Sequence, residues 1–256
     1  MQNDGGQIDI TTIEHCGFAA LPPEHTVEDG PWVLRMAGGL AKRANSANPR
    51  APGAELDPAR LERIETFYRR AGLAPIVRIT PLAVPGADAL LAARGYRIAD
   101  SSLVMTAPLA TAPTATRPDG IGISIDTAIP DTWHDAFAQF DSLDAHGRTT
   151  RRAMLAALDR PHAAITLRDA RATVVGIGLA VRDGMQVGLF DVRVARDARG
   201  RGLGRAVTAA MLDWARTHGS AHAYLQVNAD NAPARRLYRS LGFTEAYAYH
   251  YRIGAA

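Results

Sequence analysis

The residues best suited to chemistry form a glycine-rich turn, Arg199-Gly200-Arg201-Gly202-Leu203-Gly204. A largely apolar run, Val187 to Val194, precedes the turn and predicts a strand, and apolar residues from Leu203 to Trp214 recur at helical spacing. Glycines between a strand and a helix N-terminus let several backbone N–H groups point into one concavity, with the positive end of the helix dipole behind them. The turn therefore predicts a diphosphate-binding site.

Two well-known phosphate-binding motifs do not fit this turn. Counted from Gly202, the third glycine position of the dinucleotide fingerprint holds Val207, and the Gly-Lys-Ser/Thr of a P-loop is missing. The turn does match Arg-x-x-Gly-x-Gly, and in this it resembles the acetyl-CoA loop of the GNAT family of N-acetyltransferases.

A second segment strengthens the resemblance. Residues 231–243 match the closing segment of the same family, Asn-x-x-Ala-x-x-Leu-Tyr-x-x-x-Gly-Phe. Asn231 is a good N-cap, Pro233 suits a first helical turn, and Gly242 suits the left-handed position that ends a helix. Two motifs in the family's order are much harder to produce by chance than either alone.

The elements predicted after residue 120 follow the order that this family uses. They are a strand at 121–125, helices at 131–140 and 149–158, strands at 163–168, 172–182 and 185–194, a helix from Gly202, a strand at Tyr224, a helix from Ala232 and a strand at 246–253. The resemblance therefore implies an α/β fold with a mixed sheet, in which residues 120–256 form the catalytic GNAT domain.

The first half is less regular. Its predicted helices are 8–20, 58–71 and 87–93, its predicted strands are 32–36, 76–79 and 96–105, and residues 48–57 are predicted as a loop. Residues 91–96 imitate 238–243, a helix that ends in glycine plus an aromatic residue, although Leu91 replaces Tyr238. Residues 69–74 satisfy the related pattern Arg-x-x-Gly-x-Ala but follow a helix instead of a strand, which indicates a helix C-cap. We expect residues 1–110 to be a degenerate GNAT-like lobe and 111–119, within an Ala/Thr/Pro-rich stretch, to be a linker.

The resemblance implies a role for the residues around the turn. The main chain of Val192, Arg193 and Val194 would bind the pantetheine arm of acetyl-CoA as an added strand, and the turn would hold the diphosphate. The full set of expected cofactor-binding residues is Val192, Arg193, Val194, Arg199, Gly200, Arg201, Gly202, Leu203, Gly204, Arg205, Asn231 and Ala234.

Tyr238 stands where the family keeps a tyrosine that donates to the departing sulfur. A tyrosine with a pKa of about 10 is a weaker acid than a thiol with a pKa of about 8.5, so complete proton transfer would cost about 2 kcal/mol. We therefore expect a hydrogen bond to the developing thiolate. A packed core tyrosine is the alternative.

The acceptor amine must lose a proton, which costs roughly 4.6 kcal/mol at pH 7 for a lysine-like amine. Some relatives carry a basic carboxylate where Gly188 stands here, and strand alternation directs Asp191 to the opposite face, so the general base is unassigned. By resemblance, Asp141, Asp144 and His146, between two helices, contact the acceptor. Their alternative is a set of solvated loop side chains.

Two further groups have two interpretations each. Tyr247, Tyr249 and Tyr251 alternate along the last strand, and either stack over the acceptor cleft or pack against the first half. Asn45 and Ser46 belong either to a polar pocket or inter-lobe network, or to an Asx-type turn.

Composition narrows the class of protein. The chain of 256 residues has 47% hydrophobic residues, enough for a sizeable core, and a single cysteine, Cys16, which excludes an internal disulfide framework. Its start lacks a secretory signal and no run is long enough to span a bilayer, so we expect a cytoplasmic protein without a membrane partner. The histidines show no ligand spacing, so no metal is expected.

The net charge is +3, with arginines dense from Arg193 to Arg205. That density suits the phosphates of coenzyme A or a solvated edge, and the lack of interleaved aromatic residues argues against nucleic acid. The sequence therefore predicts an acetyl-CoA-dependent N-acetyltransferase that acts on a primary amine of a small molecule or protein. The alternative is a non-catalytic CoA-binding sensor or scaffold, which the missing carboxylate at Gly188 favours. An O-acetyltransferase and a homodimeric assembly are left open.

Overall fold

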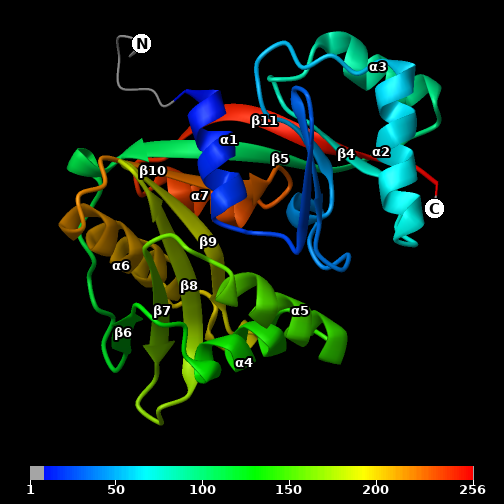
Figure 1. Ribbon diagram of the computed structural model, residues 1–256. Helices are drawn as coiled ribbons and strands as arrows, with labels where there is room; N and C mark the ends of the chain where they lie inside the picture. The colour runs from blue at the N-terminus through cyan, green and yellow to red at the C-terminus, as the bar shows by residue number, and fades with distance from the viewer. Residues whose placement is uncertain (1–8, 256) are drawn as a thin grey trace.

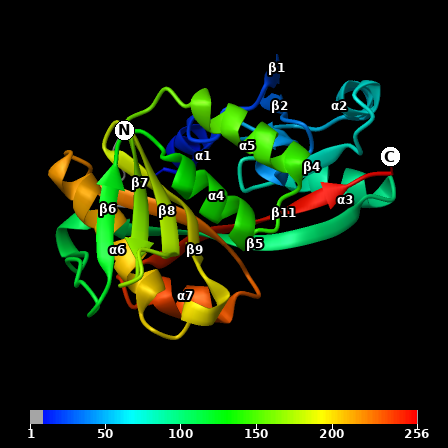
Figure 2. The same cartoon turned by 90° about the horizontal axis from the view of Figure 1, so that it is seen from below.

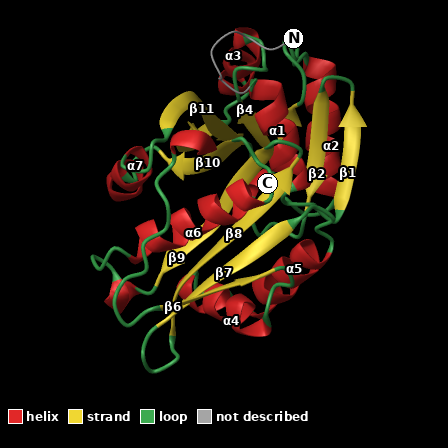
Figure 3. Cartoon of the chain, turned by 90° about the vertical axis from the view of Figure 1, so that its left-hand side faces the viewer, coloured by secondary structure: helices red, strands yellow, loops and turns green. Residues whose placement is uncertain are grey.

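The computed structural model describes residues 9–255, which share one mixed sheet of eleven strands (Figure 1). In sheet order the strands are β1 (His25–Asp29), β2 (Trp32–Met36), β3 (Ala47–Pro49), β4 (Ile76–Ile79), β11 (Thr244–Ile253), β5 (Arg97–Pro108), β10 (His222–Asn228), β9 (Gln186–Val194), β8 (Val174–Asp183), β7 (His162–Arg168) and β6 (Gly122–Asp126). The pairs β3–β4 and β9–β10 are parallel and the other neighbours are antiparallel. Strands β1 and β6 form the two edges (Figure 3).

The helices cover both faces of this sheet (Figure 2). They are α1 (Ile10–Ala19), α2 (Pro58–Arg70), α3 (Pro85–Ala93), α4 (Asp131–Phe140), α5 (Ala145–Ala156), α6 (Leu203–Thr217) and α7 (Ala232–Arg239), with 3-10 turns at Lys42–Ala44, Leu109–Thr111 and Arg196–Ala198. One core cluster joins α6 to β7–β10, and a second joins α1, α4 and α5 to the opposite face. Gly178 allows helix α6 to lie close to β8, since a Cβ at this position would come within 2.6 Å of Val207 and 2.7 Å of Met211.

Strands β5 and β11 are exchanged between the two halves of the chain. Strand β5 ends the first half, yet it pairs with β10 and β11, while β11 ends the second half and pairs with β4 and β5. In the first half, β1, β2, β3 and β4 are followed in the sheet by β11; in the second half, β7, β8, β9 and β10 are followed in the same way by β5. Strands β5 (green) and β11 (red) are the long strands in Figure 1. The sheet is therefore continuous across the stretch expected to be a linker.

Several element boundaries differ from the sequence prediction. The second helix after residue 120 begins at Ala145, not Thr149, because Asp144 Oδ1 accepts the Gly147 N–H at 2.7 Å and caps it. Residues 47–49 form a strand where a loop was expected at 48–49, and β5 continues to Pro108. Strand β1 was missed because its residues are almost all exposed and show no alternation. The first helix begins at Ile10, and its predicted start at Ile8 lies outside the described residues.

Candidate active site

A bulge in β9 opens the sheet. Strands β9 and β10 pair only as far as Leu189 and Leu225. On the other side, Leu179 faces Phe190 whereas Ile177 faces Arg193, so β9 carries one residue more than β8 over this stretch. Within the bulge Asp191 has a φ of 53°. An inserted residue bends the strand, and β9 consequently diverges from β10.

The divergence leads into a cavity of about 800 Å³ between β9, β10, α7 and the turn before α6. Most of the predicted site residues line it: Val192, Arg193, Val194, Arg199, Gly200, Gly202, Leu203, Gly204, Asn231, Ala234, Tyr238 and Asp141. Arg201, Arg205, Asp144 and His146 lie outside its lining. The sequence motifs thus converge on one cavity although they come from three separate segments.

The turn before α6 presents free backbone amides to this cavity. Gly202, the N-cap residue, has a φ of 77° and Gly200 a φ of 78°, and a Cβ at either would meet no atom within 4 Å. The N–H groups at positions 203–205 have no acceptor within residues 9–255. In α2, by contrast, the Asp57 carboxylate accepts the Arg60 N–H at 2.7 Å. The α6 terminus is therefore the kind that binds an anionic ligand.

The arginines near the turn have different partners. Arg193 donates to both oxygens of Asp141, at 2.6 and 3.0 Å, so this pair closes one side of the cavity. Arg205 donates to Ser240 Oγ at 2.8 Å and fastens α6 to the end of α7. These two guanidiniums are held in place by the protein itself.

Tyr238 lies on α7 with 9% of its surface exposed. Burial raises the pKa of its phenol above the ordinary value, so the group is protonated at neutral pH. Its hydroxyl makes no hydrogen bond with any residue in the described part of the chain, while its ring packs against Phe243. The O–H is therefore available to a ligand in the cavity.

The expected orientation of Asp191 is wrong. The bulge interrupts strand alternation, and Asp191 binds Arg151 of α5, whose guanidinium lies 4.8 Å from the Phe137 ring centroid on the α4–α5 face. Gly188 lies on that same face, since a Cβ there would approach Phe190 and Tyr224 to 2.4 and 2.6 Å. A side chain at Gly188 would therefore require Phe190 and Tyr224 to move, so this arrangement leaves no space for a carboxylate at that position.

Positive charge gathers at this end of the cavity. Arg43, from the 3-10 turn Lys42–Ala44, lines the cavity with its guanidinium 5.5 Å from the Phe190 ring centroid. Burial lowers the pKa of Arg151 to about 9, and the cations of Arg43 and Arg193 act in the same direction. Sequence reasoning missed Arg43, because the loop that carries it has no motif.

Of the remaining expected acceptor residues, one caps α5 and the other connects α5 to the first half. Asp144 caps α5, and His146 Nε2 lies 3.2 Å from the carbonyl oxygen of Gly38. Asp141 and Asp144 lie between α4 and α5 as expected, whereas His146 lies in the first turn of α5. Of the three, Asp141 lines the cavity.

The tyrosines and Asn45 have structural roles in the described region. Tyr247 binds Glu14 of α1, and Tyr249 donates to Gln226, which lines the cavity, at 2.7 Å. Tyr247 and Tyr249 therefore both contact the first half, the latter through Arg78 over its ring, and Tyr249 also contacts a residue of the cavity. Asn45 is buried and its side chain makes four hydrogen bonds to backbone groups of residues 37–41. These bonds reach back four to eight residues, so they form a polar network within the preceding loop and not the Asx-type turn.

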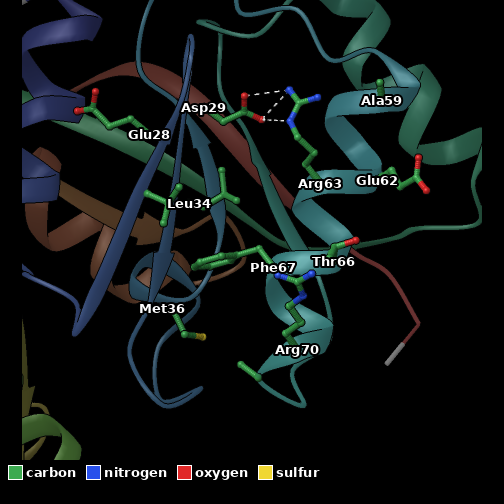
Figure 4. A pocket seen from close by; sticks show the side chains of 12 residues that line it. Glu28, Asp29, Leu34, Met36, Ala59, Glu62, Arg63, Thr66, Phe67 and Arg70 are labelled. Atoms are coloured by element: carbon green, nitrogen blue, oxygen red, sulfur yellow. Dashed lines mark hydrogen bonds and ion pairs between the residues drawn. The ribbon is translucent and has the colours of Figure 1, made fainter.

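A second cavity, of about 790 Å³, lies between β1–β2 and α2 (Figure 4). Its apolar wall includes Leu34 and Phe67, and its rim holds an ion pair in which Arg63 Nη2 lies 2.9 Å from Asp29 Oδ1. It shares no lining residue with the cavity at the glycine-rich turn. Within residues 9–255 we find no cluster of three metal-ligating side chains and no helix long and apolar enough to cross a membrane.

Comparisons with known proteins point to one family. The family described as "Probable histone acetyltransferase Rv0428c C-terminal" matches residues 8–252. The Uncharacterized N-acetyltransferase YobR of Bacillus subtilis is 28% identical over 246 residues, 96% of this chain and 98% of that protein. A Mycothiol acetyltransferase of Clavibacter michiganensis is 32% identical over 241 residues, 86% of this chain and 79% of that protein.

Solved structures are similar in fold. A GCN5-related N-acetyltransferase from Kribbella flavida superposes with a TM-score of 0.74 at 18% identity, over 98% of this chain and 97% of that one. A tandem GNAT protein from the clavulanic acid biosynthesis pathway superposes with a TM-score of 0.66 at 17% identity, over 95% of this chain and 88% of that one.

Proposed function

The chain belongs to the GNAT family of N-acetyltransferases, and from this premise we propose that it transfers the acetyl group of acetyl-CoA to a primary amine in the cavity between β9 and β10. The acceptor amine belongs to a small molecule or a protein. The observation that carries the proposal is the row of unpaired amides at the start of α6, which open into this cavity and suit the diphosphate of coenzyme A.

Separate groups of residues bind acetyl-CoA and accommodate the steps of the transfer. The main chain at 192–194, freed from β10 by the bulge, binds the pantetheine arm, and Asn231 and Ala234 border it. The amine nitrogen attacks the thioester carbonyl, a C–N bond forms, and the C–S bond breaks with its electron pair moving to sulfur. The amine's proton passes to water, since Asp191 and Asp141 both bind arginines.

Tyr238 stabilises the sulfur as negative charge develops there. Because burial raises the pKa of its phenol, complete proton transfer to the thiolate costs more than the roughly 2 kcal/mol expected for unperturbed groups. A short hydrogen bond from the neutral phenol is the cheaper route, and it exists only once the thiolate begins to form.

We also assign the chemistry to residues 120–256 and describe residues 1–110 as a degenerate lobe. The counterpart of α6 in the first half is α2, whose first amides are capped by Asp57. In addition, Ala54 pairs with Ala83 and closes the gap that would match the cavity. One acetyl-CoA per chain is the expected stoichiometry, which calorimetry measures.

The test is release of free thiol from acetyl-CoA over a panel of primary amines, with the acetylated products identified by mass spectrometry. Thiol release that depends on both protein and amine supports transfer. Tight CoA binding without thiol release for any amine would instead favour a CoA-binding sensor or scaffold, a role to which the lack of space at Gly188 lends support.

A further inference from the structure

Two arginines line the cavity without an acidic partner among the described residues: Arg199, in the turn before α6, and Arg43, at the other end. The Arg43 side chain makes no ion pair or hydrogen bond with the residues at 9–255, and its contact is the face of Phe190. The two neighbouring guanidiniums are neutralised, Arg193 by Asp141 and Arg151 by Asp191. One uncompensated positive charge therefore remains at this end of the cavity.

Arg43 lies across the sheet from the diphosphate site. Phe190 belongs to the core cluster on the α4–α5 face, whereas Leu203, at the start of α6, belongs to the cluster on the opposite face. The cavity runs between the two faces where β9 and β10 part. Its Arg43 end is thus the side from which an acceptor reaches a thioester whose phosphates are bound at α6.

The loop that carries Arg43 is held by buried contacts. Asn45 Oδ1 accepts the N–H groups of Ala37 and Gly39, both at 2.8 Å, and Arg35 Nη1 donates to the Arg43 carbonyl oxygen at 2.9 Å. These bonds fix the backbone on either side of the guanidinium. None of these bonds involves the Arg43 side chain, so Arg43 can be replaced without breaking the hydrogen bonds that hold the loop.

We propose that Arg43 binds an anionic group of the acceptor, so that the acceptor is an amine that also carries a carboxylate or a phosphate. A guanidinium matches the two oxygens of either anion. It also repels a simple ammonium, whereas an amine with its own negative charge is attracted. The proposal rests on the acetyltransferase function proposed above, which it extends to the acceptor class.

The experiment compares matched amines that differ in the anion. The probes are L-lysine against L-lysinamide, and O-phosphoethanolamine against ethanolamine, which separate carboxylate from phosphate. For each probe we would measure kcat/KM by thiol release and, in parallel, the Kd with which the probe binds the full chain in its complex with CoA. The Kd for acetyl-CoA is measured separately for each variant. The variants are Arg43→Met, Arg43→Lys and Arg94→Met, which removes a charge from an exposed position in the α3 C-cap.

The wild-type protein should prefer the anionic member of at least one pair by about 10- to 100-fold, the usual effect of one charge-assisted hydrogen bond. Arg43→Met should abolish this preference with the Kd for acetyl-CoA unchanged, Arg43→Lys should restore part of it, and Arg94→Met should retain it. Equal use of both members by the wild type, or a preference that survives Arg43→Met, overturns the proposal. Binding preference without thiol release would overturn the acetyltransferase function and leave the anion site standing, so the two failures are distinguishable.

Discussion

Glu14 and Arg78 form an ion pair that is almost completely enclosed, with 1% and 2% of their side chains exposed. Arg78 Nη2 donates to Glu14 Oε1 at 3.0 Å, and the same oxygen accepts the Tyr247 hydroxyl at 2.5 Å. The guanidinium also lies 3.8 Å from the centroid of the Tyr249 ring. Through these contacts α1 and β4 of the first half are joined to β11, the last strand of the chain.

Removal of one partner should therefore be costly. We expect Arg78→Met to lower the free energy of unfolding by about 3–5 kcal/mol, because Glu14 is left as a buried, unpaired charge. Urea unfolding measures the loss. The double variant Glu14→Gln/Arg78→Met should recover most of it, and a single variant that loses less than about 1 kcal/mol would mean that the pair is hydrated.

The strand exchange predicts that neither half is stable alone. A fragment of residues 118–256 lacks β5, so β10 and β11 both lose the partner that lies between them. Two unpaired edges and an uncovered apolar face should cause aggregation or a clearly lower Tm. As a control, co-expression of residues 1–117 with 118–256 should restore a soluble complex. A monomeric fragment with full activity and an unchanged Tm would contradict this account.

Strand β11 is also tied to α3 by a charge that responds to pH. Hydrogen bonds from Arg252 and His250 lower the pKa of Asp88 to about 2, below the unfolded value of about 3.9. The stabilisation is therefore present above about pH 4 and is lost as the pH falls through 2. Asp88→Asn should cost roughly 1 kcal/mol at pH 7, a modest figure because the side chain is one-third exposed, and the difference from wild type should narrow toward pH 3. A difference that is constant from pH 7 to pH 3 would rule out the ionised carboxylate as its source.

What the sequence predicts well is local. Gly202 and Asn231 each predict the start of a helix within a few residues, and both line the cavity. The helix-to-strand close at 91–96 likewise predicted α3 and β5. In each case the backbone geometry depends on residues that are neighbours in the chain.

What the sequence does not predict depends on partners far along the chain. The direction of Asp191 follows from a bulge that is defined by pairing with β8, which no alternation pattern in β9 alone reveals. The exchange of β5 and β11 is a choice of neighbours, and either strand has the same apolar pattern in both arrangements. Arg43 reaches the cavity only because its loop packs against α5 and Phe190.

A substitution in the turn before α6 tests the diphosphate site. Gly202→Val should abolish acetyl-CoA binding in calorimetry, because the new side chain would extend into the space that the ligand needs and would strain a residue whose φ is 77°. Gly72→Val is the matched control: Gly72 has a φ of 69°, with nothing within 4 Å of its Cβ, at the end of α2. Both variants carry the strain, so they should lose similar stability, while only the first loses the ligand. Unchanged affinity in a folded Gly202→Val protein would make the turn a connection without a binding role.

Tyr238→Phe tests the fate of the thiolate. The variant should lower kcat by about 10- to 1000-fold, because it removes one hydrogen bond to a developing charge, worth about 1.5–4 kcal/mol in a preorganised site. The Kd for acetyl-CoA should stay nearly the same, since the diphosphate is bound at α6 and the phenol has no partner among the described residues to lose. The ring keeps its packing against Phe243, so the free energy of unfolding should change by less than about 1 kcal/mol. An unchanged kcat would assign Tyr238 to the core, whereas a collapse in acetyl-CoA affinity at normal kcat would make it a positioning residue.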